Sequence, residues 1–122
     1  MSLRYKSILS FVWSTDIEKS KTFYSNVLGM NVVFESDGWV ELSIPGTQNA
    51  FIALNKWAQK GKHPVNEYLT LSVEGIDDFR KTLQARDVPL KGDMRDFPEQ
   101  GLRMFKFTDP SGNILTAAEV EN

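Results

Sequence analysis

The pattern of this sequence repeats once at a nearly constant spacing, and this repeat restricts the folds that the chain can adopt. Ile17 opens a helical pattern, and Ile76 opens a second one 59 positions later. Further along each half, the strand patterns that start at Trp39 and Leu102 lie 63 positions apart. We therefore predict two tandem copies of one module, with a slightly longer loop in the second copy.

The first half predicts one strand, one helix and three further strands. Residues 8–12 form a short apolar run. A helix of about twelve residues is expected next, because Thr15 and Glu18 have the spacing of a capping box and Gly29 suits the left-handed position at a helix end. Strands are expected at residues 31–35, 39–44 and 51–55, with turns at 37–38 and 45–46 between them.

The second half has the same order of patterns. Residues 68–73 alternate as a strand does, and residues 76–86 have helical spacing, with Asp87 in the place of Gly29. Strands are expected near residue 90 and at 102–107 and 114–118. We predict an α+β fold in which residues 1–122 form one domain of two βαβββ modules. Module one covers about 6–55, the linker 56–67 and module two about 68–118.

Composition excludes several kinds of site. The 122 residues contain no Cys and one His, which excludes disulfides, thiolate metal sites and a multi-histidine centre within one chain. The net charge of −2 lacks the basic excess that nucleic-acid binding needs. No apolar run approaches a membrane span of roughly 18 residues, and no segment resembles a signal peptide. We expect a cytoplasmic protein without a nucleic-acid or membrane partner.

Two motifs carry a resemblance to a known family. The segment FYSNVLGM at residues 23–30 resembles the "FYxxVLG" helix end of the vicinal oxygen chelate superfamily, which includes glyoxalases, bleomycin-resistance proteins and extradiol dioxygenases. The segment DPSGN at residues 109–113 resembles the "DPxGN" turn before the last strand of that family. The resemblance spans about residues 8–118. It implies that each module rolls its mixed sheet into a partial barrel beside one helix.

The resemblance also implies where a divalent metal would bind. Enzymes of the superfamily place His, Glu or Gln ligands on the inward faces of the first and last strands of both modules. Those positions correspond here to Leu9, Ala53, Tyr68 and Thr116. Leu and Ala cannot coordinate a metal, and Tyr and Thr coordinate poorly. We therefore predict no metal centre and no cofactor. His63 lies in the linker and is expected to be a solvated loop histidine.

Strand alternation predicts the inward side chains. Apolar and aromatic walls with a few polar groups are typical of a small-molecule site. The alternative for the aromatic residues is that Trp13 and Phe11 fill the inside of a closed barrel. The alternative for the charged residues is that Glu41 and Lys106 lie at solvated sheet edges and bind nothing. The predicted ligand-binding residues are Phe11, Trp13, Trp39, Glu41, Phe51, Asn55, Tyr68, Thr70, Met104, Lys106 and Thr116.

These observations leave several functions open. The first is a metal-free binding protein, similar to bleomycin-resistance proteins, that holds a hydrophobic or aromatic small molecule. A metal-dependent lyase, isomerase or dioxygenase is the second, and a metal-free enzyme that uses Glu41 or Tyr68 as acid or base is the third. An accessory role without a small molecule is the last. No catalytic residue is assigned. The family resemblance and the predicted sheet edges favour a homodimer.

Overall fold

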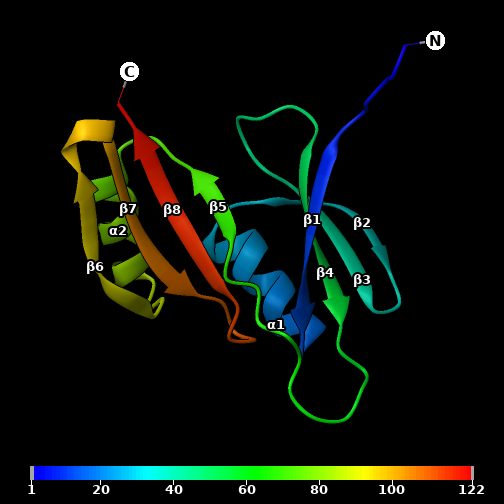
Figure 1. The fold of residues 1–122 in the computed structure, drawn as a ribbon. Coiled ribbons are helices and arrows are strands. Elements are labelled where there is room, and N and C mark those ends of the chain that lie inside the picture. Colours follow the sequence, from blue (N-terminus) through cyan, green and yellow to red (C-terminus); the bar gives the residue numbers. More distant parts are fainter. Residues whose placement is uncertain (1, 122) are drawn as a thin grey trace. The chain divides into compact units, whose positions relative to one another are not determined.

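The computed structural model describes residues 2–121, and the first half of the chain folds into one four-stranded sheet with a helix on one face (Figure 1). The strand order is β1-β4-β3-β2, and only the β1–β4 pair is parallel. The elements in chain order are β1 (Ile8–Ser14), α1 (Ile17–Thr22), the π-helical turn η1 (Phe23–Val27), β2 (Asn31–Ser36), β3 (Trp39–Ser43) and β4 (Ala50–Lys56).

The second half repeats this arrangement with the strand order β5-β8-β7-β6, so the predicted pair of βαβββ modules is confirmed. The chain divides into two compact units, Met1–His63 and Pro64–Asn122. Neither four-stranded sheet is closed into a barrel. The elements are β5 (Leu69–Ser72), α2 (Ile76–Ala85), β6 (Leu90–Phe97), the 3-10 turn η2 (Pro98–Gln100), β7 (Leu102–Thr108) and β8 (Ile114–Val120).

The first helix is capped by Asp16. Its side-chain oxygen accepts a hydrogen bond from the amide three residues later, at 3.2 Å. The prediction that Thr15 caps this helix is wrong by one residue, because Asp16 has the extended backbone of an N-cap (φ −149°). After α1 the helix widens into η1, where the Leu28 amide donates to the Phe23 carbonyl at 3.0 Å. Gly29 then takes a φ of +75°, the left-handed conformation predicted for it.

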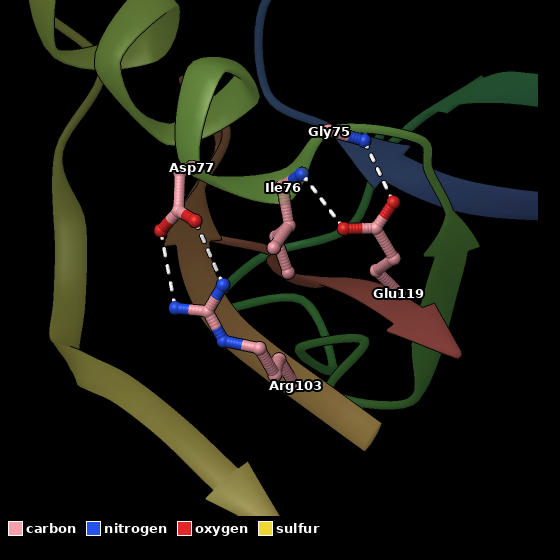
Figure 2. Close-up of polar contacts among 5 residues, drawn as sticks. All are labelled: Gly75, Ile76, Asp77, Arg103 and Glu119. Carbon is pink, nitrogen blue, oxygen red and sulfur yellow. Dashed lines mark hydrogen bonds and ion pairs between the residues drawn. The ribbon is translucent and has the colours of Figure 1, made fainter. Parts of the chain in front are cut away.

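The second helix is anchored by a strand (Figure 2). Gly75 has a φ of +64° and no side chain with which to cap α2. The Glu119 carboxylate of β8 replaces that cap, because it accepts from the Gly75 amide at 2.7 Å and from the Ile76 amide at 3.1 Å. Beside it, the Arg103 guanidinium of β7 donates two hydrogen bonds to Asp77, at 2.8 and 3.1 Å. A negative charge at a helix N-terminus is favourable, so both carboxylates stabilise the start of α2.

Each sheet has an apolar core on the face that its helix covers. In the first unit α1 packs against β3 and β4, and in the second α2 packs against β8. The Phe79 ring of α2 also lies 6.3 Å from the Phe105 ring of β7. Every second strand residue points into these cores. The buried apolar residues on these helix-covered faces include Val12, Val40, Leu42, Ile52 and Leu54 in the first unit, and Leu71, Phe105, Phe107, Leu115 and Ala117 in the second.

Two sequence-based expectations about the segment between the sheets differ from the structure. Tyr68 was expected to begin a strand, but β5 starts at Leu69 and the Tyr68 side chain is 89% exposed. His63 was expected to be solvated, but it is only 9% exposed and its ring lies 6.2 Å from the Trp57 ring. No helix among residues 2–121 combines the length and the apolar character that a membrane crossing requires.

Candidate functional site

The helix-free face of the first sheet gathers all six site residues predicted in the first half. Side chains that pair across neighbouring strands lie on the same face, so the strand register divides this face into rows. Phe11, Ala53 and Glu41 form the central row, and Trp13, Asn55 and Trp39 form the next. On the other side of the centre, Leu9, Phe51 and Ser43 form the third row. We call these nine residues the aromatic face.

Three large rings lie together on this face. The centroid of the Phe11 ring is 5.2 Å from that of Trp13, with the planes at 82°, and 6.3 Å from that of Trp39. These are the separations of favourable aromatic pairs. Phe11 is 42% exposed, and both Trp side chains are partly exposed. The rings therefore do not fill the inside of a closed barrel, and they present apolar surface that a ligand can cover.

Glu41 brings the one charge of the aromatic face. The Trp39 indole Nε1 donates a hydrogen bond to Glu41 Oε2 at 2.8 Å. Trp39 and Glu41 are two residues apart on β3, so strand alternation places both on one face. Glu41 also pairs across the sheet with Ala53, which is fully buried and has no side chain beyond its methyl group. The carboxylate is consequently held against the indole and partly exposed, rather than free at a solvated edge.

Trp57 extends the aromatic cluster, and sequence reasoning missed it. Its ring lies 5.0 Å from the Trp13 ring at 74°, and its Nε1 donates to the Gly61 carbonyl at 3.0 Å. The buried His63 ring also lies beside Trp57, with the two ring centroids 6.2 Å apart. The sequence predicts a linker over residues 56–67, so no ring of this segment is expected at the site. Strand alternation could have predicted the position of Trp57, because this residue continues the series Phe51, Ala53, Asn55 by one more step.

Phe34 is a second addition to this face. A register shift between Val32 and Phe34 places Phe34 opposite Glu41. Such a bulge moves the following side chains to the other face of the sheet. Strict alternation along β2 cannot predict that shift, so Phe34 was not recognised. Its side chain is exposed, and the residue lies directly opposite Glu41 on β2, the strand next to β3.

The remaining predicted residues lie on the second sheet, which forms a separate unit. Thr70, Thr116 and Lys106 occupy one row across β5, β8 and β7, and Met104 lies in the next row. Thr116 is buried, whereas Lys106 and Met104 are partly exposed. Tyr68 precedes the sheet and is exposed. The structure therefore unites the predicted residues within each half, in two sets.

The residues at the family's metal positions do not fit a divalent ion. Leu9 and Ala53 lie on the aromatic face, and neither side chain has a donor atom. The second-half positions are the exposed Tyr68 and the buried Thr116, both poor ligands. Throughout residues 2–121, His, Asp and Glu side chains do not gather in any group of three or more that could hold a metal ion.

Comparison with known proteins identifies the family. Residues 7–116 match the model of the glyoxalase/bleomycin resistance protein/dioxygenase superfamily. Since the match covers most of the chain, this protein belongs to that superfamily. No curated protein sequence matches the chain.

Several solved structures share this fold. A member of the superfamily from Sphaerobacter thermophilus is 30% identical, with a TM-score of 0.81 over 96% of this chain and 98% of that one. TnmS3, an antibiotic binding protein from Streptomyces sp. CB03234, is 25% identical, with a TM-score of 0.81 over 99% of each chain. A lactoylglutathione lyase from Agrobacterium tumefaciens is 17% identical, with a TM-score of 0.76 over 94% of each chain, and this likeness concerns the fold alone.

Proposed function

We propose that this protein binds a hydrophobic or aromatic small molecule on the aromatic face, without a metal ion. The observation that carries the proposal is the group of partly exposed rings on the helix-free face, with Phe11 at 42% exposure between Trp13 and Trp39. A stacked planar ligand would remove this apolar surface from water, which stabilises a complex by about 25 cal/mol per Å². The similarity to an antibiotic binding protein supports the same function.

The side chains at the metal-ligand positions of the superfamily favour metal-free binding over a metal-dependent reaction. A Lewis-acid mechanism needs an ion with an open coordination position beside the substrate. Leu9 and Ala53 offer no ligand atom at the corresponding positions of the first module. Acid–base chemistry by Tyr68 also loses support, because this residue precedes the second sheet and its side chain is exposed. Glu41 remains as the polar group that orients a ligand among the rings.

Binding is tested by titrating chelator-treated protein with Nile red. This neutral dye has an emission that rises in apolar surroundings. We expect saturable binding that Phe11→Ser weakens about tenfold, because the ring supplies apolar contact area. The matched control is Val120→Ser, which removes an exposed apolar side chain from the second sheet. Equal affinity of the two variants would place the dye elsewhere and overturn the proposed site.

The metal-free character needs its own measurement. Protein purified without chelator is analysed for its metal content, and then titrated with Mn, Fe, Co, Ni and Zn. We expect no stoichiometric uptake and no change in Nile red affinity on addition of each metal. One metal per chain or per dimer would contradict the proposal and show that ligands other than Leu9 and Ala53 hold it. His63 and Glu41 would then be the first residues to replace.

We also propose that the protein is a homodimer. Both sheets have two edge strands, and exposed apolar side chains lie on those of the first sheet, including Ile8 on β1 and Val33 and Phe34 on β2. Exposed apolar edges are typical of surfaces that pair with another chain. Light scattering after size-exclusion chromatography should give twice the chain mass of 13.9 kDa. A mass that stays at one chain at high concentration would exclude the dimer.

A further inference from the structure

We infer that the ligand of the aromatic face is an organic cation, with a positive charge on a flat apolar body. This inference rests on the proposed binding function and adds the charge of the ligand to it. Among the nine residues of the aromatic face, Glu41 is the only ionisable one. The β2 residues that pair with this face, Asn31, Phe34 and Ser36, are all uncharged.

The charge of Glu41 has no cationic partner within residues 2–121. Its one hydrogen bond comes from the neutral indole of Trp39, at 2.8 Å. Within residues 2–121, Lys21 forms an ion pair with Glu35 and Arg103 forms one with Asp77, and neither pair includes Glu41. The hydrogen bond keeps the carboxylate beside the rings instead of letting it turn into bulk water. A fixed, uncompensated negative charge therefore marks the aromatic face.

The rings add to the same preference. The face of an aromatic ring is negative, so Trp, Tyr and Phe attract a cation that lies within about 6 Å of the ring centroid. Trp39 holds the Glu41 carboxylate, and the Phe11 and Trp13 rings lie on the same face, so the face offers three such rings and one carboxylate. A neutral ligand that covered Glu41 would remove a charge from water without compensation, which is costly. An anionic ligand would in addition be repelled. Only a cation gains from both the rings and the carboxylate.

The test uses three two-ring probes that differ in charge: N-methylquinolinium as the cation, quinoline as the neutral probe at neutral pH, and 1-naphthoate as the anion. All three Trp residues lie in the first unit, so tryptophan fluorescence reports on that unit alone. We expect the cation to bind about tenfold more tightly than quinoline, and 1-naphthoate to bind most weakly. The preference for the cation should decrease as salt is added, because salt screens partly exposed charges.

The variant Glu41→Gln isolates the charge. The glutamine carbonyl can still accept from the Trp39 indole, so the shape of the face and the hydrogen bond are kept. We expect this variant to lose most of the tenfold preference, because it binds N-methylquinolinium more weakly than the wild type does and binds quinoline at least as tightly. The matched control is Glu35→Gln, which removes the same charge from β2, opposite Val40 on the other side of the sheet. The control should keep the preference.

Different outcomes separate this inference from the proposed function. Equal binding of the three probes, or a preference that Glu41→Gln leaves intact, would overturn the cationic ligand while binding on the aromatic face stands. Failure of N-methylquinolinium to bind protein that does bind Nile red would overturn it as well. If Phe11→Ser and Val120→Ser bind Nile red equally, the proposed site fails, whatever the charge preference.

Discussion

The two sheets have the same topology, and their helix-free faces differ at equivalent register positions. In both sheets, the first and last strands pair in parallel and the third strand pairs antiparallel with the last. The central row contains Phe11, Ala53 and Glu41 in the first sheet, and Thr70, Thr116 and Lys106 in the second. An aromatic ring thus corresponds to a threonine methyl group, and a carboxylate to an ammonium group.

The next row shows the same change. Trp39 of the first sheet corresponds in register to Met104 of the second. Across the outer strand pair, Phe34 lies opposite Glu41, whereas Lys91 lies opposite Lys106. The helix-covered faces, in contrast, are apolar in both sheets. Packing against a helix allows little besides apolar residues, while a helix-free face is constrained mainly by what it binds. The modules therefore differ on their helix-free faces, one of which carries the proposed ligand site.

The largest effect on stability should come from substitutions in the helix-covered faces, which are apolar in both modules. Leu42→Ala in the first core and Leu115→Ala in the second should each lower the free energy of unfolding by about 2–5 kcal/mol, because both leucines are fully buried. Val120→Ala, at an exposed position of β8, is the control and should cost far less. Urea unfolding followed by circular dichroism measures all three. A loss at only one of the two leucines would break the equivalence of the cores.

Replacing Trp39 by the residue of the second sheet sharpens the contrast between the helix-free faces. Trp39→Met should weaken N-methylquinolinium binding about tenfold, because one ring and the hydrogen bond that positions Glu41 are lost together. Fluorescence of Trp13 and Trp57 still reports binding. Met104→Leu is the control in the second sheet and should leave affinity unchanged. Unchanged affinity in Trp39→Met would show that the ring plays no part in recognition.

Local pattern was enough to predict much of the fold. The register pairs Phe11 with Ala53 and Thr70 with Thr116, so the spacings of 59 and 63 positions hold for the parallel pairs. Asp87 has a φ of +60°, as its place after α2 predicts. Strand alternation and helix spacing are local signals that depend on which side of each element is buried. These signals predict the order of the elements and which side chains of β1, β3 and β4 lie on the helix-free face.

Long-range contacts and irregular backbone were not predictable in the same way. Glu119 is 44 residues from Gly75 along the chain, and no local motif marks it as the cap of α2. The bulge in β2 reverses the side of Phe34, and the exposure of Tyr68 depends on where β5 starts. Such features are set by the packing of distant segments. Alternation accordingly predicted that the rings of the regular strands share one face, and it did not predict that Phe34 at the bulge joins them.

The helix starts offer a smaller effect that also separates the modules. The first helix uses its own Asp16, while the second depends on Glu119 from β8. Glu119→Ala should lower the free energy of unfolding by about 1 kcal/mol, as the loss of a helix cap does. Asp16→Ala should have a similar effect in the first unit. Denaturation curves from circular dichroism measure both. A free energy of unfolding that is the same in Glu119→Ala and wild type would show that water replaces the carboxylate at no cost.

The smallest effects on stability should come from the surface ion pairs Lys21–Glu35 and Arg103–Asp77. The effects of these two pairs should appear at opposite ends of the pH scale. In the second unit, the hydrogen bonds from Arg103 lower the pKa of Asp77 below its ordinary 3.8. The pair therefore adds stability above pH 3.8, and this contribution is lost as the pH falls through the lowered pKa. In the first unit, the hydrogen bond to Glu35 raises the pKa of Lys21 above 10.5. That contribution is present below pH 10.5 and is lost as the pH rises through the raised pKa.

Two neutral variants test this difference between the units. Asp77→Asn should flatten the acid limb of the stability profile of the second unit, and Lys21→Gln should flatten the alkaline limb of the first. Because all the Trp residues lie in the first unit, urea unfolding followed by fluorescence reads that unit, and circular dichroism reads the sum of both. The shifts in midpoint should be small, since exposed ion pairs contribute little in water. An acid limb that is the same in Asp77→Asn and wild type would show that Arg103 does not stabilise the ionised form of Asp77, and the start of α2 would then depend on Glu119 alone.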